Sequence, residues 1–174
     1  IRRGAYWSLV PFEDLLTYMK KEADSEGRFK TSISLPTGDY TVYDILAGQR
    51  LRLTRKDGRI RVPVEMQRFG GTLLALMDKR IRSIKIRGPK RASKDEPAVY
   101  RLEVTGPKTG LVPVRVVVTS PRGEEPEYSG IFLARNGIAE LKIIPAKNDA
   151  PGNWSLQATE LFSGKKAGLK IRRE

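Results

Sequence analysis

The segment LVPVRVVVTS, residues 111–120, decides the fold class of the second half of the chain. Val112, Val114, Val116 and Val118 recur at every second position, while Arg115 falls on the opposite face. Alternate side chains of a β-strand point to opposite faces, so this spacing predicts a strand with one buried and one exposed face. Such strands are typical of antiparallel sheets that pack on one side only.

Six further segments around this strand have strand character and are separated by turn residues. The expected strands are, in order, 81–87, 98–106, 111–120, 127–135, 138–145, 153–161 and 166–172. Turn signals such as Asn136-Gly137 and Ser163-Gly164 lie between them. Seven short antiparallel strands in about 95 residues are typical of an immunoglobulin-like sandwich. Because the chain has no Cys to bridge the sheets, we expect Trp154 and the valine and leucine faces to form the core.

The first eighty residues predict a smaller β-sandwich preceded by one helix. Phe12, Leu15, Leu16 and Met19 follow the i, i+3, i+4, i+7 spacing of an amphipathic helix, expected at about 11–22. Strands are expected at 28–35, 39–46, 50–56, 59–66 and 72–77. The expected fold class is therefore mainly β, with two tandem antiparallel β-sandwiches: residues 1–80 with the N-terminal helix, and residues 81–174, immunoglobulin-like.

The positive charge of the chain is concentrated in one stretch. The chain carries 33 Lys and Arg against 20 Asp and Glu, and residues 50–94 hold fifteen of the basic residues and three of the acidic ones. Asp57-Gly58 predicts a two-residue hairpin turn, which would pair Lys56 with Arg59 and Arg50 with Glu65. The basic face expected for this hairpin consists of Arg50, Arg52, Lys56, Arg59 and Arg61.

This hairpin face has two interpretations. As a polyanion-binding site it would hold nucleic acid or an acidic glycan through charge. Nucleic-acid-binding sheets interleave such charge with stacking aromatics, and this face has none. We therefore favour the interpretation that this face is a solvated surface, and we do not expect nucleic acid as a partner. Binding of a polyanion is kept as the alternative. Carbohydrate binding by stacking would need exposed aromatics, for which the candidates are Tyr6, Trp7, Tyr43 and Tyr128.

Composition excludes several catalytic classes. Without Cys or His, the chain itself cannot form a zinc finger, a Cys–His nucleophile or a Ser-His-Asp triad. Asp95-Glu96 and Glu124-Glu125-Glu127 lack the interleaved spacing of a calcium loop, so solvated acids are favoured. Nothing selects a pair of catalytic carboxylates. We expect no enzyme activity, no catalytic, cofactor-binding or metal-binding residues, and no cofactor.

No run of residues approaches the roughly 20 apolar residues that span a bilayer, so no membrane span is expected. The chain begins with Ile1 rather than Met, and we expect it to be part of a larger protein. The absence of Cys does not argue against export, because many exported domains lack disulfides.

Two segments resemble parts of known families. Residues 42–48 (VYDILAG), with the hairpin that follows and the apolar strand 73–77, resemble the small sandwich behind the catalytic barrel of bacterial β-galactosidase-like glycoside hydrolases. Residues 148–154 (NDAPGNW) and 159–165 (TELFSGK) are similar to the closing hairpin of macroglobulin-type immunoglobulin-like domains.

This resemblance covers most of residues 28–172 and implies a non-catalytic accessory region, either a structural spacer or one associated with carbohydrate. The parent would be a large exported bacterial protein, periplasmic, cell-surface or secreted, and the partners would be its neighbouring domains. The catalytic residues of the glycoside hydrolases belong to the barrel, so none is expected here.

Overall fold

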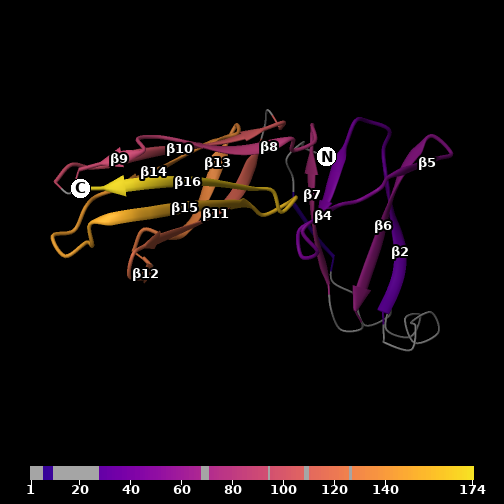
Figure 1. The fold of residues 1–174 in the computed structure, drawn as a ribbon. Helices are drawn as coiled ribbons and strands as arrows, with labels where there is room; N and C mark the ends of the chain where they lie inside the picture. The colour runs from indigo at the N-terminus through magenta and orange to yellow at the C-terminus, as the bar shows by residue number, and fades with distance from the viewer. Residues whose placement is uncertain (1–5, 10–27, 68–70, 94, 108–109, 126) are drawn as a thin grey trace. The chain divides into compact units, whose positions relative to one another are not determined.

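The computed structural model describes residues 6–9, 28–67, 71–93, 95–107, 110–125 and 127–174 (Figure 1). All elements in these residues are β-strands, which confirms the mainly β prediction. The helix predicted at 11–22 lies outside the described residues. Within the described ranges, no helix has the length and apolar character needed to cross a membrane. The chain divides into two compact units, Ile1–Lys79 and Arg80–Glu174.

The first unit contains two antiparallel sheets. One has the order β1 (Tyr6–Leu9), β7 (Thr72–Met77), β3 (Thr41–Asp44) and β4 (Gln49–Arg50). The other has the order β2 (Arg28–Leu35), β6 (Arg59–Gln67) and β5 (Thr54–Lys56). Their buried faces share one hydrophobic core, to which β6 contributes Ile60, Val62, Val64 and Met66, and β3 and β7 contribute Val42, Leu74 and Leu76. The first unit is therefore a small structure of two sheets that enclose one core, and along β6 buried and exposed residues alternate.

Strand β1 has no counterpart in the strands expected from the sequence. Its backbone pairs with the first four residues of β7, from Tyr6 opposite Ala75 to Leu9 opposite Thr72. Four residues give too short a pattern for alternation to stand out. The pairing places β1 at the edge of the four-stranded sheet.

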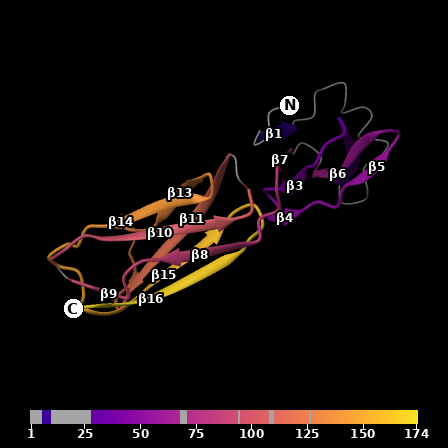
Figure 2. The same ribbon diagram turned by 90° about the horizontal axis from the view of Figure 1, so that it is seen from above.

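The second unit is one continuous sheet that folds over on itself (Figure 2). Its order is β8 (Ser83–Arg87), β10 (Ala98–Thr105), β14 (Ile138–Ile143), β13 (Gly130–Arg135), β11 (Leu111–Ser120), β15 (Gly152–Glu160), β16 (Lys166–Arg173) and β9 (Arg91–Ala92). The link between β14 and β13 is a single residue pair at their hairpin, Arg135 opposite Ile138. This weak link lets the two halves of the sheet turn toward each other, so that β8 lies beside β16.

The core of the second unit is formed by the alternate, inward-facing residues of its strands. Val112, Val114, Val116 and Val118 of β11 are all buried, as the sequence predicted, and Arg115 is exposed. The opposite layer contributes, among others, Tyr100, Leu102 and Val104 of β10 and Leu141 of β14. Burying these apolar side chains between two layers supplies the main stabilising free energy of such a unit.

Two short strands extend this sheet beyond the expected seven. β9 lies between the strands expected at 81–87 and 98–106, where no strand was predicted, and pairs in parallel with the end of β16. β12 (Gly123–Glu124) pairs with the end of β11. A two-residue bridge carries no periodic signal, so neither could be read from the sequence.

Both units contain a two-residue turn with the same backbone. Asp57 and Asn136 each have φ of 52°, followed by Gly58 at 67° and Gly137 at 83°. These values belong to the mirror-image turns that match strand twist and favour Asn-Gly or Asp-Gly. The two glycines differ in their surroundings, because a Cβ on Gly137 would overlap the carbonyl oxygen of Val104, whereas nothing lies within 4 Å of one on Gly58.

Replacing these glycines by alanine is expected to give unequal losses of stability. Gly58→Ala carries only the cost of a left-handed backbone for a residue with a Cβ, about 1–2 kcal/mol. Gly137→Ala adds a steric clash, a further 1–3 kcal/mol or so. Calorimetry of each variant measures the loss of stability in the structural unit that carries the substitution, the first unit for Gly58→Ala and the second for Gly137→Ala. Equal losses would contradict the close approach at Gly137.

Candidate functional site

The exposed side of the three-stranded sheet gathers five basic side chains, here named the basic face. Its members are Arg28 and Lys30 of β2, Lys56 of β5, and Arg59 and Arg61 of β6. They share a side because β6 buries its even-numbered residues, which leaves the odd-numbered ones and their cross-strand partners facing water. Lys56 lies opposite Arg59, as predicted from the Asp57-Gly58 turn.

Two residues of the predicted set lie elsewhere. Arg50 ends β4 and lies opposite Tyr43 in the other sheet, so its predicted pairing with Glu65 is wrong. Arg52 is exposed but falls between β4 and β5, outside either strand. The physical reason is that the chain changes sheets here: the Leu51 N–H donates to the Val42 carbonyl at 2.8 Å, and Leu53 packs against the core. Lys56, Arg59 and Arg61 are thus the part of the predicted face that one sheet holds.

The two members that the sequence analysis missed come from β2. Lys30 lies opposite Glu65, and Arg28 lies opposite Gln67. Alternation in residues 28–35 puts both on the polar side of their strand, which was the available signal. What the sequence lacked was the long-range pairing of β2 with β6, which joins them to the other cations.

The charges on the basic face are compensated unevenly. Glu65 forms ion pairs with Arg28 at 3.7 Å and Lys30 at 4.0 Å. Arg59 has a neutral partner on β2, since its Nε donates a hydrogen bond to the Ser34 hydroxyl at 2.6 Å. In the described part of the chain, Lys56 and Arg61 form no ion pair. The two cations without an ion pair therefore lie at the end of the sheet next to the Asp57-Gly58 turn.

A second polar cluster lies inside the second unit. Asp149 and Arg173 form an ion pair with 2.7 Å between carboxylate and guanidinium, and their side chains are 8% and 5% exposed. The same Asp149 oxygen accepts hydrogen bonds from the Tyr128 hydroxyl at 2.9 Å and from the Ala146 N–H at 2.8 Å. Arg173 also stacks on the Trp154 ring, 4.7 Å from its centroid. Asp149 thus joins the loop after β14 to the last strand.

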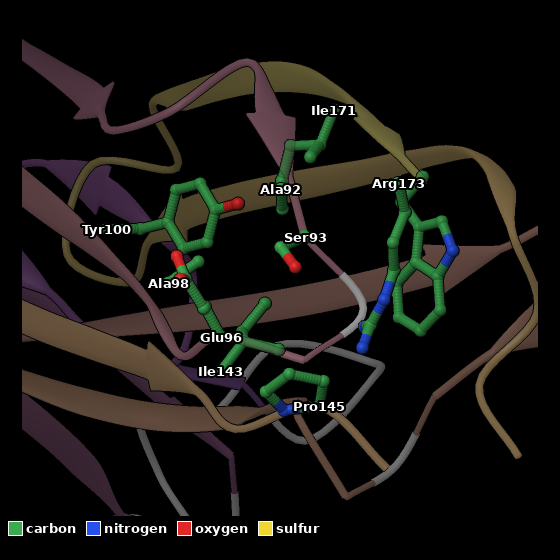
Figure 3. Close-up of a pocket in the computed structure, with 10 residues that line it drawn as sticks. Ala92, Ser93, Glu96, Ala98, Tyr100, Ile143, Pro145, Ile171 and Arg173 are labelled. Carbon is green, nitrogen blue, oxygen red and sulfur yellow. The ribbon is translucent and has the colours of Figure 1, made fainter. Parts of the chain in front are cut away.

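Arg173 borders a small cavity (Figure 3). The side chain extends from β16 into a space bordered by Ser93, Glu96 and Pro145. The cavity measures about 10 Å³, which is the size that one water molecule requires. The buried Nε of Arg173 has no hydrogen-bond partner among the described residues. Asp149 and Arg173 also line a larger, open hollow of about 760 Å³, together with Asp95, Lys147 and Glu174. Within the cluster, their mutual contacts hold the loops together.

This cluster raises the pKa of the Tyr128 phenol above its ordinary value of 10.0. Burial is the first cause, followed by the hydrogen bond that Tyr128 donates to Asp149 and the negative charge of that carboxylate. A raised pKa means that the fold favours the neutral phenol, so this stabilisation is complete below pH 10 or so and is lost as the pH rises through the native pKa. NMR titration should show Tyr128 ionising above the ordinary value and Asp149→Asn lowering its pKa. A native pKa at or below 10.0 would contradict the contact.

Another buried carboxylate, Glu160, closes the hairpin between β15 and β16. Its side chain is fully buried and accepts from the Phe162 N–H at 2.5 Å, the Ser163 N–H at 2.9 Å and the Ser163 hydroxyl at 2.5 Å. These three donors satisfy the carboxylate within its own turn. Ser163-Gly164 is accordingly a hairpin turn, as predicted.

The candidates for sugar stacking fare differently. Tyr43 is 1% exposed and cannot form a platform, which corrects that part of the prediction. Tyr128 is partly buried and its hydroxyl is bound to Asp149. Tyr6 and Trp7 lie in β1, whose side chains fall outside the described part. Among the described side chains, no three Asp or Glu residues are arranged to hold a metal ion, at Asp95-Glu96 or elsewhere.

The chain matches no family model and no curated protein.

Proposed function

We propose that this chain is a non-catalytic β-sandwich module of a larger exported bacterial protein. Its role would be to space or orient neighbouring domains and to contact carbohydrate. Residues 42–48 resemble the small sandwich of β-galactosidase-like glycoside hydrolases, and residues 148–154 and 159–165 resemble macroglobulin-type immunoglobulin-like domains. This tandem arrangement resembles the C-terminal region of large exported glycosidase-like proteins and supports a position beside a catalytic domain.

The second unit is proposed to be an immunoglobulin-like sandwich. Numbered in chain order, its seven longer strands are β8, β10, β11, β13, β14, β15 and β16, and they pair in the order first, second, fifth, fourth, third, sixth, seventh. The immunoglobulin constant-type fold places strands ABED in one sheet and CFG in the other. Here the fourth strand, β13, pairs along the third, β11, and meets the fifth, β14, at one residue pair. The two layers are therefore ABE and DCFG, so this sandwich differs from the constant type in the sheet that its fourth strand joins. Sandwiches of this kind host many functions, so the site must carry the functional argument.

The observation that carries the non-catalytic role is how the buried charged groups of the second unit are used. Asp149 and Arg173 neutralise each other, and Glu160 is bound by three donors of its own turn. Catalytic acids and bases need to face a site that a substrate can enter. Asp149 and Arg173 do border an open hollow of about 760 Å³, but each is bound by the other, and Glu160 is bound within its own turn. These buried charges therefore support the fold.

An activity screen tests this proposal. The purified chain should release no product from chromogenic glycosides, carboxyl esters or phosphate esters above the rate seen with heat-denatured chain. Turnover that a folded Asp149→Asn or Glu160→Gln variant abolishes would overturn the non-catalytic assignment.

A further inference from the structure

We propose that the basic face of the first unit binds an acidic polysaccharide, a polymer that carries sulfate or uronic acid groups. This proposal names the class of carbohydrate that the module would contact, and it rests on the function proposed above. Its members are separate in sequence: β2 supplies two cations, and the β5–β6 hairpin supplies three. The sheet alone brings them together.

The spacing of these side chains suits a polymer of repeated charge. Arg59 and Arg61 follow each other on one side of β6, about 7 Å apart along the strand. Lys56 lies opposite Arg59 on β5, about 5 Å away across the sheet. All three are exposed, and Lys56 and Arg61 have no ion-pair partner in the described residues. An incoming anion would therefore displace water there rather than a protein carboxylate.

The polar residues between the cations favour a glycan over nucleic acid. Ser32, Ser34 and Thr54 occupy the same side of the sheet, and Glu65 lies among the cations of β2. These groups can exchange hydrogen bonds with sugar hydroxyls. The Glu65 carboxylate repels phosphate, sulfate and uronate groups alike, so the anionic groups of the ligand would bind near Lys56 and Arg61 and its hydroxyls near Glu65. In the described part of the chain, no aromatic side chain lies on this side for stacking bases. A polymer with both anionic groups and hydroxyls matches the whole surface.

The test uses the full chain and three immobilised probes, heparin, polygalacturonate and duplex DNA, at about 150 mM salt, where diffuse attraction is largely screened. We expect a Kd of roughly 1–100 μM for at least one polysaccharide and weaker binding to DNA. Lys56→Glu with Arg61→Glu should weaken polysaccharide binding by about tenfold or more and lower the dependence on salt by about two charges.

The matched control is Arg50→Glu with Arg52→Glu. It changes the net charge equally, on exposed residues of the same unit that lie off the basic face. This variant should bind within about threefold of wild type, since only the diffuse field changes. Circular dichroism verifies that both variants are folded.

Three results would overturn the site: equal losses in the two double variants, no polysaccharide binding at this salt, or tighter binding to duplex DNA. Each of them leaves the non-catalytic assignment standing, because that assignment fails only if the chromogenic substrates are turned over.

Discussion

Replacing Asp149 with alanine should destabilise the second unit by about 3–5 kcal/mol, the usual cost of removing one partner of a buried ion pair. Arg173, 5% exposed, would keep its charge without the carboxylate 2.7 Å away. The Tyr128 hydroxyl and the Ala146 N–H would lose the same acceptor. Urea unfolding measures the loss as a lower midpoint of the second unit.

Two further variants show whether the ion pair is the cause. The double variant Asp149→Leu with Arg173→Met removes both charges, and its loss should be smaller than that of Asp149→Ala, because no buried charge remains. Glu103→Gln breaks an ion pair with Arg87 that is open to solvent and should leave the midpoint near that of wild type. If Asp149→Ala behaves like Glu103→Gln, the buried cluster does not stabilise the fold.

Trp154→Ala should also cost about 3–5 kcal/mol, as large-to-small changes in a core do. The Trp154 side chain is 3% exposed, its ring lies against Tyr128 at 6.0 Å between centroids, and its Nε1–H donates to the Ala150 carbonyl at 2.8 Å. The prediction made from the sequence, that Trp154 is a core residue, is confirmed by this burial.

Trp154→Phe separates the packing of the ring from its hydrogen bond. Phenylalanine keeps much of the apolar surface but leaves the Ala150 carbonyl without its donor, so a loss of about 1–3 kcal/mol is expected. Thermal unfolding compares the two variants. A near-native melting temperature for Trp154→Ala would refute the core assignment.

Much of the fold could be predicted from local pattern. The strands expected at 72–77 and 111–120 have those bounds in the structure. The first is a short continuous apolar run and the second alternates apolar and exposed residues, and turn residues flank both. The Asp57-Gly58 hairpin was predictable from its turn residues, since few residues other than Asn, Asp and Gly accept φ near +50°. Where one face is buried, the pattern also fixes the register.

Pairing between distant segments was beyond reach. Apolar and polar residues alternate without interruption from Arg50 to Thr54, so the sequence predicts one strand there. In the structure Arg50 and Leu51 pair with β3 of the four-stranded sheet, and the chain then crosses to β5 of the three-stranded sheet. The same limit applied to the candidate site, because Arg28 and Lys30 join the basic face through β2–β6 pairing. Tyr43 was expected among exposed aromatics, but its strand lies inside the four-stranded sheet and is buried there.

The second unit should fold as a module without the first. A fragment of residues 80–174 contains all strands of the sheet from β8 to β16 and the cluster around Asp149. Its thermal unfolding, followed by calorimetry and by Trp154 fluorescence, is the most direct measurement. We predict one cooperative transition, within a few degrees or so of the transition of this unit in the full chain. A fragment without a transition, from a chain that shows one, would contradict the division into modules.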